Sequence, residues 1–160
     1  VWLLRHDVAR RTVRAKELPR FSAVALLAGY AWLILAGVVW LVPGPVGNGS
    51  RGYDAVVHAV FLGFAMSMVL AHAPIILPAV LGRELPYRPV MYLPLALLQV
   101  GLVLRIFIGD GLDLTAPWQV GAALNVIALL LFVVVAAVSV ALGAPKVRTA
   151  ISPERMPTSP

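Results

Sequence analysis

The stretch from Asp54 to Leu81, DAVVHAVFLGFAMSMVLAHAPIILPAVL, decides the fold of this chain. A hydrophobic segment of about 20 residues is long enough to cross a bilayer as a helix, and this stretch is longer. It contains two histidines, His58 and His72, in otherwise apolar sequence. Because an ionisable side chain in such a segment is costly, each histidine is a candidate functional residue.

The composition places the rest of the chain in a membrane as well. Of the 160 residues, 61% are hydrophobic and 12% are charged, whereas soluble domains average about 25% charged residues. The absence of cysteine excludes disulfides, thiolate metal sites and iron–sulfur clusters. Together with three further apolar runs, the composition predicts an all-α, polytopic transmembrane bundle with spans at residues 21–42, 54–81, 89–109 and 118–142.

The distribution of basic residues predicts the orientation of this bundle. Residues 1–20, the loop at 82–88 and the tail at 143–160 hold 11 of the 13 lysines and arginines. Cytoplasmic loops carry such an excess, so both ends should face the cytoplasm, with 1–20 as a basic segment and 143–160 as a disordered tail. The expected location is the bacterial inner membrane. The net charge of +6 does not indicate a nucleic-acid partner, because the basic residues lie in short loops between apolar runs.

The first residues of the chain predict a longer parent protein. The sequence begins with Val1, and VWLL is followed at once by the basic RHDVARRTVR, as at the cytoplasmic end of a membrane helix. The expected partners are therefore the lipid bilayer and missing N-terminal helices of the same parent chain. A homo-oligomer is a further possibility.

Two features of the 54–81 stretch predict how it packs. Pro74 and Pro78 each remove a backbone donor, so the helix should kink or break near its inner end. Small residues in a ridge let another helix approach closely. Small residues recur here at every fourth position and form such a ridge, at Ala55, Ala59, Gly63, Ser67 and Ala71.

The predicted topology allows two clusters of polar residues. An inner cluster would contain His72 and Gln99, at similar depth in their helices. An outer cluster would contain His58, Arg105, Asn125 and one of Asp54, Asp110 and Asp113.

Each of these residues also has a structural interpretation. Arg105 could extend to the outer surface and pair with Asp110. Asn125 and Gln99 could form hydrogen bonds between helices, and Met66 and Met68 are expected to pack against neighbouring side chains.

The two histidines have the spacing of separate sites. They are 14 residues apart, which in an α-helix places them within about 40° around the axis but about 21 Å apart along it. His58 and His72 therefore cannot bind one metal ion together. Each histidine could bind a separate group, take part in a proton relay or pack against neighbouring side chains.

The run HAVFLGFAMSMVLAHAPIILPAVLGRELPYRP resembles the NnrS family of haem- and copper-containing membrane proteins, which is linked to the nitric-oxide response. It resembles the core subunit of haem–copper oxidases more distantly. The similarity covers about a fifth of the chain. It rests on His58, Phe61-Leu62-Gly63-Phe64, His72-Ala73-Pro74 and Pro78.

This resemblance implies a cofactor and residues that hold it. His58 and His72 would be candidate ligands of haem or copper. The chemistry of haem separately suggests a role for Arg105, near the outer interface, as a cation that pairs with a propionate. Two histidines in four spans cannot complete a dioxygen-reducing centre, so the implied role is binding or sensing a redox ligand such as nitric oxide, rather than catalysis.

Two other classes of function remain open. In a transporter or channel subunit, a proline-broken helix and polar residues would line a path. In a structural membrane protein, the polar residues would only join helices. A hydrolase is not indicated, because the sequence has no P-loop, paired catalytic carboxylates, HExxH or nucleophile elbow.

Overall fold

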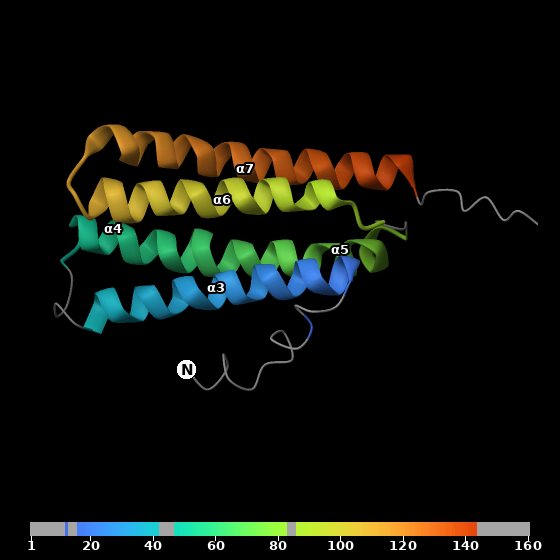
Figure 1. The fold of residues 1–160 in the computed structure, drawn as a ribbon, viewed down its shortest axis with the longest axis horizontal. Coiled ribbons are helices and arrows are strands. Elements are labelled where there is room, and N and C mark those ends of the chain that lie inside the picture. Colours follow the sequence, from blue (N-terminus) through green and yellow to red (C-terminus); the bar gives the residue numbers. More distant parts are fainter. Residues whose placement is uncertain (1–11, 13–15, 42–46, 83–85, 144–160) are drawn as a thin grey trace, which may run out of the picture.

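The computed structural model describes residues 12, 16–41, 47–82 and 86–143. These residues form four long helices and no strand, which confirms the predicted all-α bundle of four spans (Figure 1). The first helix is α3 (Glu17–Leu41), and the second consists of α4 (Arg51–His58), η1 (Ala59–Met66) and α5 (Ser67–Leu81). The third consists of η2 (Pro89–Met91), α6 (Tyr92–Val103) and η3 (Leu104–Asp110), and the fourth is α7 (Thr115–Leu142).

All four helices are long and apolar enough to cross a membrane. The start of α3 and the end of α7 lie at the same end of the bundle (Figure 1). Three helices begin a few residues earlier than predicted, at Glu17, Arg51 and Thr115. The early start of α4 is explained by Ser50, which caps the helix. Its Oγ accepts a hydrogen bond from the backbone N–H of Tyr53 at 3.1 Å.

The two predicted terminal segments fall largely outside the described part of the chain. Of the basic segment at 1–20, the structure describes residues 12 and 16–20, and the last four of these belong to α3. Of the tail at 143–160, it describes Gly143.

The helical turn widens in the middle of the second helix and at the end of the third. Both η1 and η3 are π-helical, with hydrogen bonds from residue i to i+5. In an α-helix, positions four apart drift by about 40° with each step, and the wider turn of η1 offsets part of that drift. The small-residue ridge is consequently buried throughout its length, at Ala55, Ala59, Gly63, Ser67 and Ala71.

The ridge lets α3 approach the second helix closely, as predicted. A Cβ added to Gly63 would overlap the side chain of Trp32 on α3. One added to Gly29 of α3 would lie 3.3 Å from the backbone oxygen of Phe64 and from Cβ of Ser67. Glycine at these positions therefore brings the two helices together.

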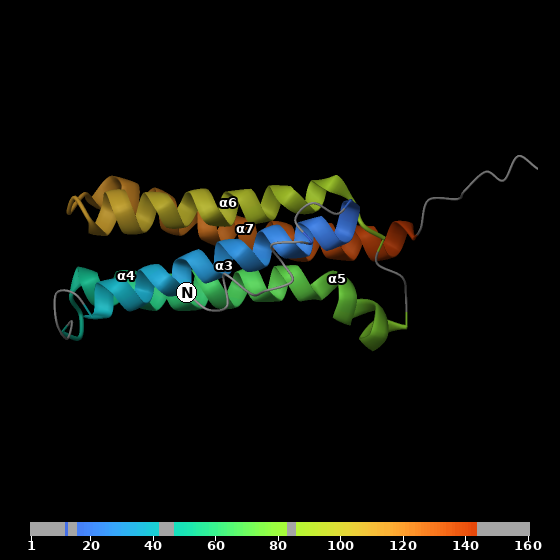
Figure 2. The same ribbon diagram turned by 60° about the horizontal axis from the view of Figure 1, so that its bottom comes forward.

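The prolines bend the second helix without breaking it. α5 runs through Pro74 and Pro78 to Leu81, and its last turns point away from α6 and α7 (Figure 2). A proline inside a helix removes one hydrogen bond and clashes with the preceding turn, which accounts for the bend. The predicted kink is therefore present, and the alternative of a broken helix is wrong.

The bundle consists of two helical hairpins. α3 packs along the second helix to form the first hairpin, and η2, α6 and η3 pack along α7 to form the second. Gln99 of the second hairpin joins the two: its Oε1 accepts a hydrogen bond from Trp32 Nε1 at 2.5 Å, and its Nε2 donates to Ser67 Oγ at 3.1 Å. The predicted hydrogen bonding of Gln99 between helices is confirmed.

Replacing Gln99 with leucine should lower the free energy of unfolding by about 1–2 kcal/mol, because Trp32 Nε1 loses its acceptor in the protein interior. Chemical unfolding in mixed detergent micelles measures the change. Gln119→Leu is the matched control, since Gln119 is exposed near the start of α7. Equal stability of the two variants would contradict a structural role for Gln99.

Candidate functional site

The largest polar network lies at the end of the bundle where α4 begins and η3 ends. Asp54 and Arg105 form a bidentate ion pair, in which Nε donates to Oδ2 at 3.2 Å and Nη2 donates to Oδ1 at 3.1 Å and to Oδ2 at 2.9 Å. Arg105 is only 6% exposed. A bidentate pair of this kind satisfies a buried guanidinium geometrically as well as electrostatically.

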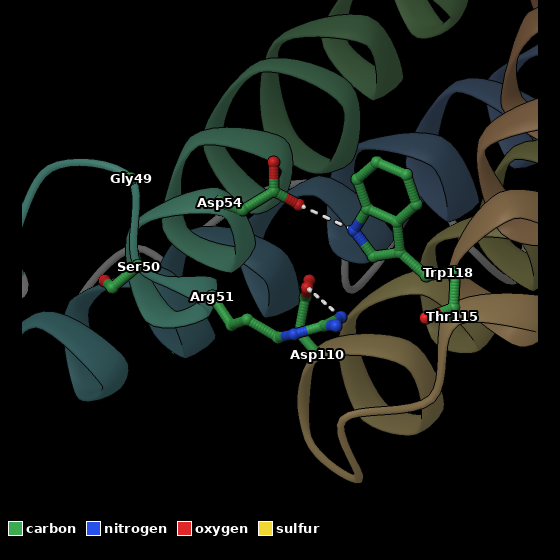
Figure 3. Close-up of a pocket in the computed structure, with 7 residues that line it drawn as sticks. All are labelled: Gly49, Ser50, Arg51, Asp54, Asp110, Thr115 and Trp118. Carbon is green, nitrogen blue, oxygen red and sulfur yellow. Dashed lines mark hydrogen bonds and ion pairs between the residues drawn. The ribbon is translucent and has the colours of Figure 1, made fainter.

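Trp118 of α7 covers this ion pair. Its indole Nε1 donates to Asp54 Oδ2 at 3.2 Å (Figure 3), and its ring lies 4.2 Å from Cζ of Arg105, within the range of a cation–π interaction. Gly109 makes room for it, because a Cβ at that position would lie 2.7 Å from Cβ of Trp118. Asp54 therefore receives hydrogen bonds from two helices of the other hairpin.

The predicted pairing of Arg105 with Asp110 is wrong. Arg105 does not extend to the surface, and its guanidinium is bound to Asp54 of the neighbouring helix. Asp110 instead has Arg51 as its nearest cation, with Nη1 3.9 Å from Oδ1. Arg51 also contacts Asp113 through Nε at 2.5 Å, so the second ion pair joins α4 to the connection between η3 and α7.

The π-helical turn of η3 explains why Arg105 and Asp110 both face the network. Residues five apart lie about 140° apart around an α-helix, which would send the two side chains in different directions. In a π-helix the residue at i+5 is the hydrogen-bonded neighbour one turn on. The side chains of both residues are accordingly buried, with exposed fractions of 7% for Arg105 and 4% for Asp110.

His58 belongs to the same network. Its Nδ1 lies 2.8 Å from the backbone oxygen of Asp54 and 3.3 Å from the carboxylate Oδ1 of the same residue. Because a carbonyl oxygen only accepts hydrogen bonds, this contact assigns the ring proton to Nδ1. In the neutral ring, Nε2 is then the nitrogen with a free lone pair.

His72 lies on α5, beyond η1, in a different environment from His58. Its Nδ1 makes the equivalent contact, 2.8 Å from the backbone oxygen of Met68, and its side chain is exposed. The π-helical η1 lies between the two histidines, so the angle of about 40° calculated for an uninterrupted α-helix does not apply. Gln99 is bound to Trp32 and Ser67, and the predicted inner pair of His72 and Gln99 is not formed.

Asn125 is not part of the network, contrary to prediction. It is 3% exposed and packs against Gly101, where a Cβ would overlap its amide oxygen. Neither its Oδ1 nor its Nδ2 has a hydrogen-bond partner among the described residues. The predicted hydrogen bond from Asn125 to another helix is therefore absent among the described residues. Of the predicted outer cluster, the structure brings together His58, Arg105 and Asp54.

Two members of the network, Arg51 and Trp118, are not among the candidate residues that the sequence indicates. A tryptophan beside an acidic loop, facing an arginine in a neighbouring apolar run, is the one signal that could have suggested Trp118.

Comparison with known proteins assigns the chain to a family. Residues 1–141 match the family described as a domain of unknown function (DUF8744), and the chain belongs to that family. The match includes every residue of the polar network and both membrane histidines. No curated protein and no solved structure matches the chain.

Proposed function

We propose that this DUF8744 protein is an integral membrane protein that binds a redox-active group, haem or copper, through its membrane histidines. The group would serve in the nitric-oxide response or in binding a related redox ligand. The observation that carries the proposal is the position of His72, an exposed imidazole on an otherwise apolar face of a membrane-spanning helix. The hydrocarbon of a bilayer offers Nε2 of this ring no hydrogen-bond partner. A group bound at Nε2 would account for a polar side chain at this position.

The geometry of both rings fits ligation. Histidines that bind metals usually donate their other ring N–H to a carbonyl or carboxylate, which fixes the ring and leaves one lone pair free. Nδ1 of His58 and Nδ1 of His72 are each 2.8 Å from a backbone oxygen one turn earlier. A haem or copper ion at Nε2 would supply the redox chemistry, and the helix would hold the imidazole in position.

The exposed face around His72 is suited to a large apolar group. Val69, Ile75 and Ile76 flank the histidine on α5, and all three are exposed. A porphyrin against this face would bury these side chains as well as the ring. Arg105, the proposed propionate partner, lies beside His58 and already has its charge neutralised by Asp54, so it would serve a group held at His58 rather than one at His72.

The proposed orientation places both ends of the bundle in the cytoplasm of a bacterial cell, in the inner membrane. It is supported by the excess of lysine and arginine in residues 1–20, 82–88 and 143–160. The start of α3 and the end of α7 lie at one end of the bundle, as an even number of spans requires (Figure 1). The network of Asp54 and Arg105 would then face the periplasm.

An optical spectrum of the detergent-purified full chain, with a metal assay on the same sample, tests the proposal. We expect a stoichiometric Soret band or stoichiometric copper, lost in His72→Ala. Val80→Ala, a change of an exposed residue of α5 about two turns away and outside this face, is the matched control and should keep the full signal. His58→Ala then shows whether the second histidine contributes.

Folding must be followed in parallel, because a misfolded variant would also lose the group. Circular dichroism and the elution volume in detergent should be unchanged in His72→Ala, since the hydrogen bond of the ring lies within its own helix and its side chain is exposed. A colourless and metal-free protein that is well folded, after growth with added haem and copper, would rule the proposal out.

A further inference from the structure

A second feature of the molecule is a pocket at the end of the bundle where α4 begins. It has a volume of about 270 Å³ and is lined by residues of α4, of the end of η3 and of the start of α7 (Figure 3). Five of its seven lining residues are polar or charged; the lining comprises Gly49, Ser50, Arg51, Asp54, Asp110, Thr115 and Trp118. Of the two proposed ligand histidines, His58 contacts Asp54 in the pocket lining and His72 lies elsewhere, so the pocket and a haem or copper site at His72 can be tested separately.

The charges around this pocket do not balance. Arg105 is fully engaged by Asp54 through three hydrogen bonds. Arg51 binds Asp113 through Nε at 2.5 Å. Asp110 is the third carboxylate, and no third arginine or lysine among the described residues pairs with it. Three carboxylates thus share two guanidinium groups, and the contact of Asp110 with Arg51 is the longest of these ion pairs.

Asp110 also lacks hydrogen bonds. Its side chain is 4% exposed, and neither carboxylate oxygen has a donor within hydrogen-bonding distance among the described residues. The nearest cationic nitrogen, Nη1 of Arg51, is 3.9 Å away and donates instead to the backbone oxygen of Gly109 at 3.4 Å. A buried carboxylate without donors is costly, and such groups in native proteins require an explanation.

We propose that the pocket binds a small monovalent cation, either a metal ion such as Na⁺ or a primary ammonium, with Asp110 as its anionic partner. A cation would supply the contact that both carboxylate oxygens of Asp110 lack. The hydroxyl of Thr115, on the pocket wall, supplies a neutral oxygen. A divalent ion fits less well, because Asp110 is the one carboxylate of the pocket lining without a hydrogen-bond donor among the described residues.

The ring of Trp118 and the guanidinium of Arg51 limit the size of the ligand. Both line the pocket together with Asp110, and Arg51 would repel any cation not in direct contact with a carboxylate. The pocket therefore favours a compact cation that can touch Asp110 over a bulky one. Na⁺ and a primary ammonium share this chemistry, and the experiment distinguishes them.

The melting temperature of the detergent-purified full chain tests the proposal. It is measured in chloride salts of sodium, potassium, ammonium and methylammonium at one ionic strength, with tetraethylammonium as a bulky reference that has no N–H donor. A ligand that binds only the folded state raises the melting temperature, by a few degrees when it is well above its dissociation constant. We expect such a rise with at least one small cation, and the salt that produces it identifies the class.

Asp110→Asn should abolish the dependence on that cation, because the amide removes the charge and supplies its own donor. Asp113→Asn is the matched control. Asp113 is an acid in the same connection that pairs with Arg51, but its side chain is 80% exposed and does not line the pocket. The control should keep the full rise. If Asp110→Asn fails to fold, Thr115→Ala provides a second variant, which should weaken the cation dependence without removing the carboxylate.

Three results would overturn the proposal. In the first, the native chain melts at the same temperature in every salt, including the bulky reference. In the second, Asp110→Asn keeps the whole cation-dependent rise. In the third, Asp110→Asn and Asp113→Asn lose the rise equally, which would show that the cation acts on the general charge of this end of the bundle. None of these results depends on the presence of haem or copper.

Discussion

Replacing Asp54 with alanine is expected to lower the free energy of unfolding by about 3 kcal/mol or more. The substitution leaves Arg105 only 6% exposed and without its counter-ion, and it also removes the acceptor of Trp118 Nε1. Breaking a buried ion pair from one side is far more costly than replacing both partners. Reversible unfolding in mixed detergent micelles measures the change.

Two further variants isolate the cause of this loss. Asp113→Ala removes an exposed carboxylate that pairs with Arg51 and should change stability little. Adding Arg105→Met to Asp54→Ala should recover a large part of the stability, because no uncompensated charge remains in the interior. The explanation would be wrong if the single Asp54 variant were as stable as the Asp113 variant.

Gly121→Ala is expected to lower the free energy of unfolding by about 1–3 kcal/mol. A Cβ at Gly121 would lie 2.6 Å from the backbone oxygen of Gly101, 2.7 Å from the backbone nitrogen of Arg105 and 2.9 Å from Arg105 Cβ. These atoms belong to the backbone of the neighbouring helix or are fixed to it. α6 and α7 must therefore separate to admit one methyl group, which also displaces Arg105 from Asp54.

Gly37→Ala is the matched control for this substitution. Gly37 also lies inside a helix, α3, but a Cβ added there would meet nothing within 4 Å. Alanine favours a helix over glycine by about 1 kcal/mol, so this variant should be slightly more stable than the native chain. If both variants raised the stability, the close contact between α6 and α7 would not limit the packing of the bundle.

The four spans could be predicted from the sequence because each is one long window of apolar residues. The close packing of α3 on the second helix could also be predicted, since glycine, alanine and serine recur at a fixed spacing from Ala55 to Ala71. Gln99 was expected to bond between helices because it is a polar residue in the middle of an apolar span. These features depend on properties of a single helix.

The site depends on how the helices are rotated against one another, which the sequence pattern does not specify. Arg105 could have reached either Asp54 or Asp110, and sequence proximity favoured Asp110. The π-helical η3 changes which residues share a face. The spacing of apolar residues in the sequence does not predict this π-helical segment. The contact of Trp118 with Asp54 likewise follows from the glycine at 109, whose importance becomes clear only when the helix opposite is known.

The division into two hairpins has a consequence for biogenesis. Asp54 enters the membrane with the first hairpin, and Arg105 and Trp118 enter with the second. The first hairpin inserted alone would carry Asp54 without its counter-ion and Trp32 without its acceptor. The second would carry Arg105 without its counter-ion and Gln99 without its donor. Docking of the hairpins removes both defects at once. The polar contacts thus favour the assembled bundle over either half alone in the membrane.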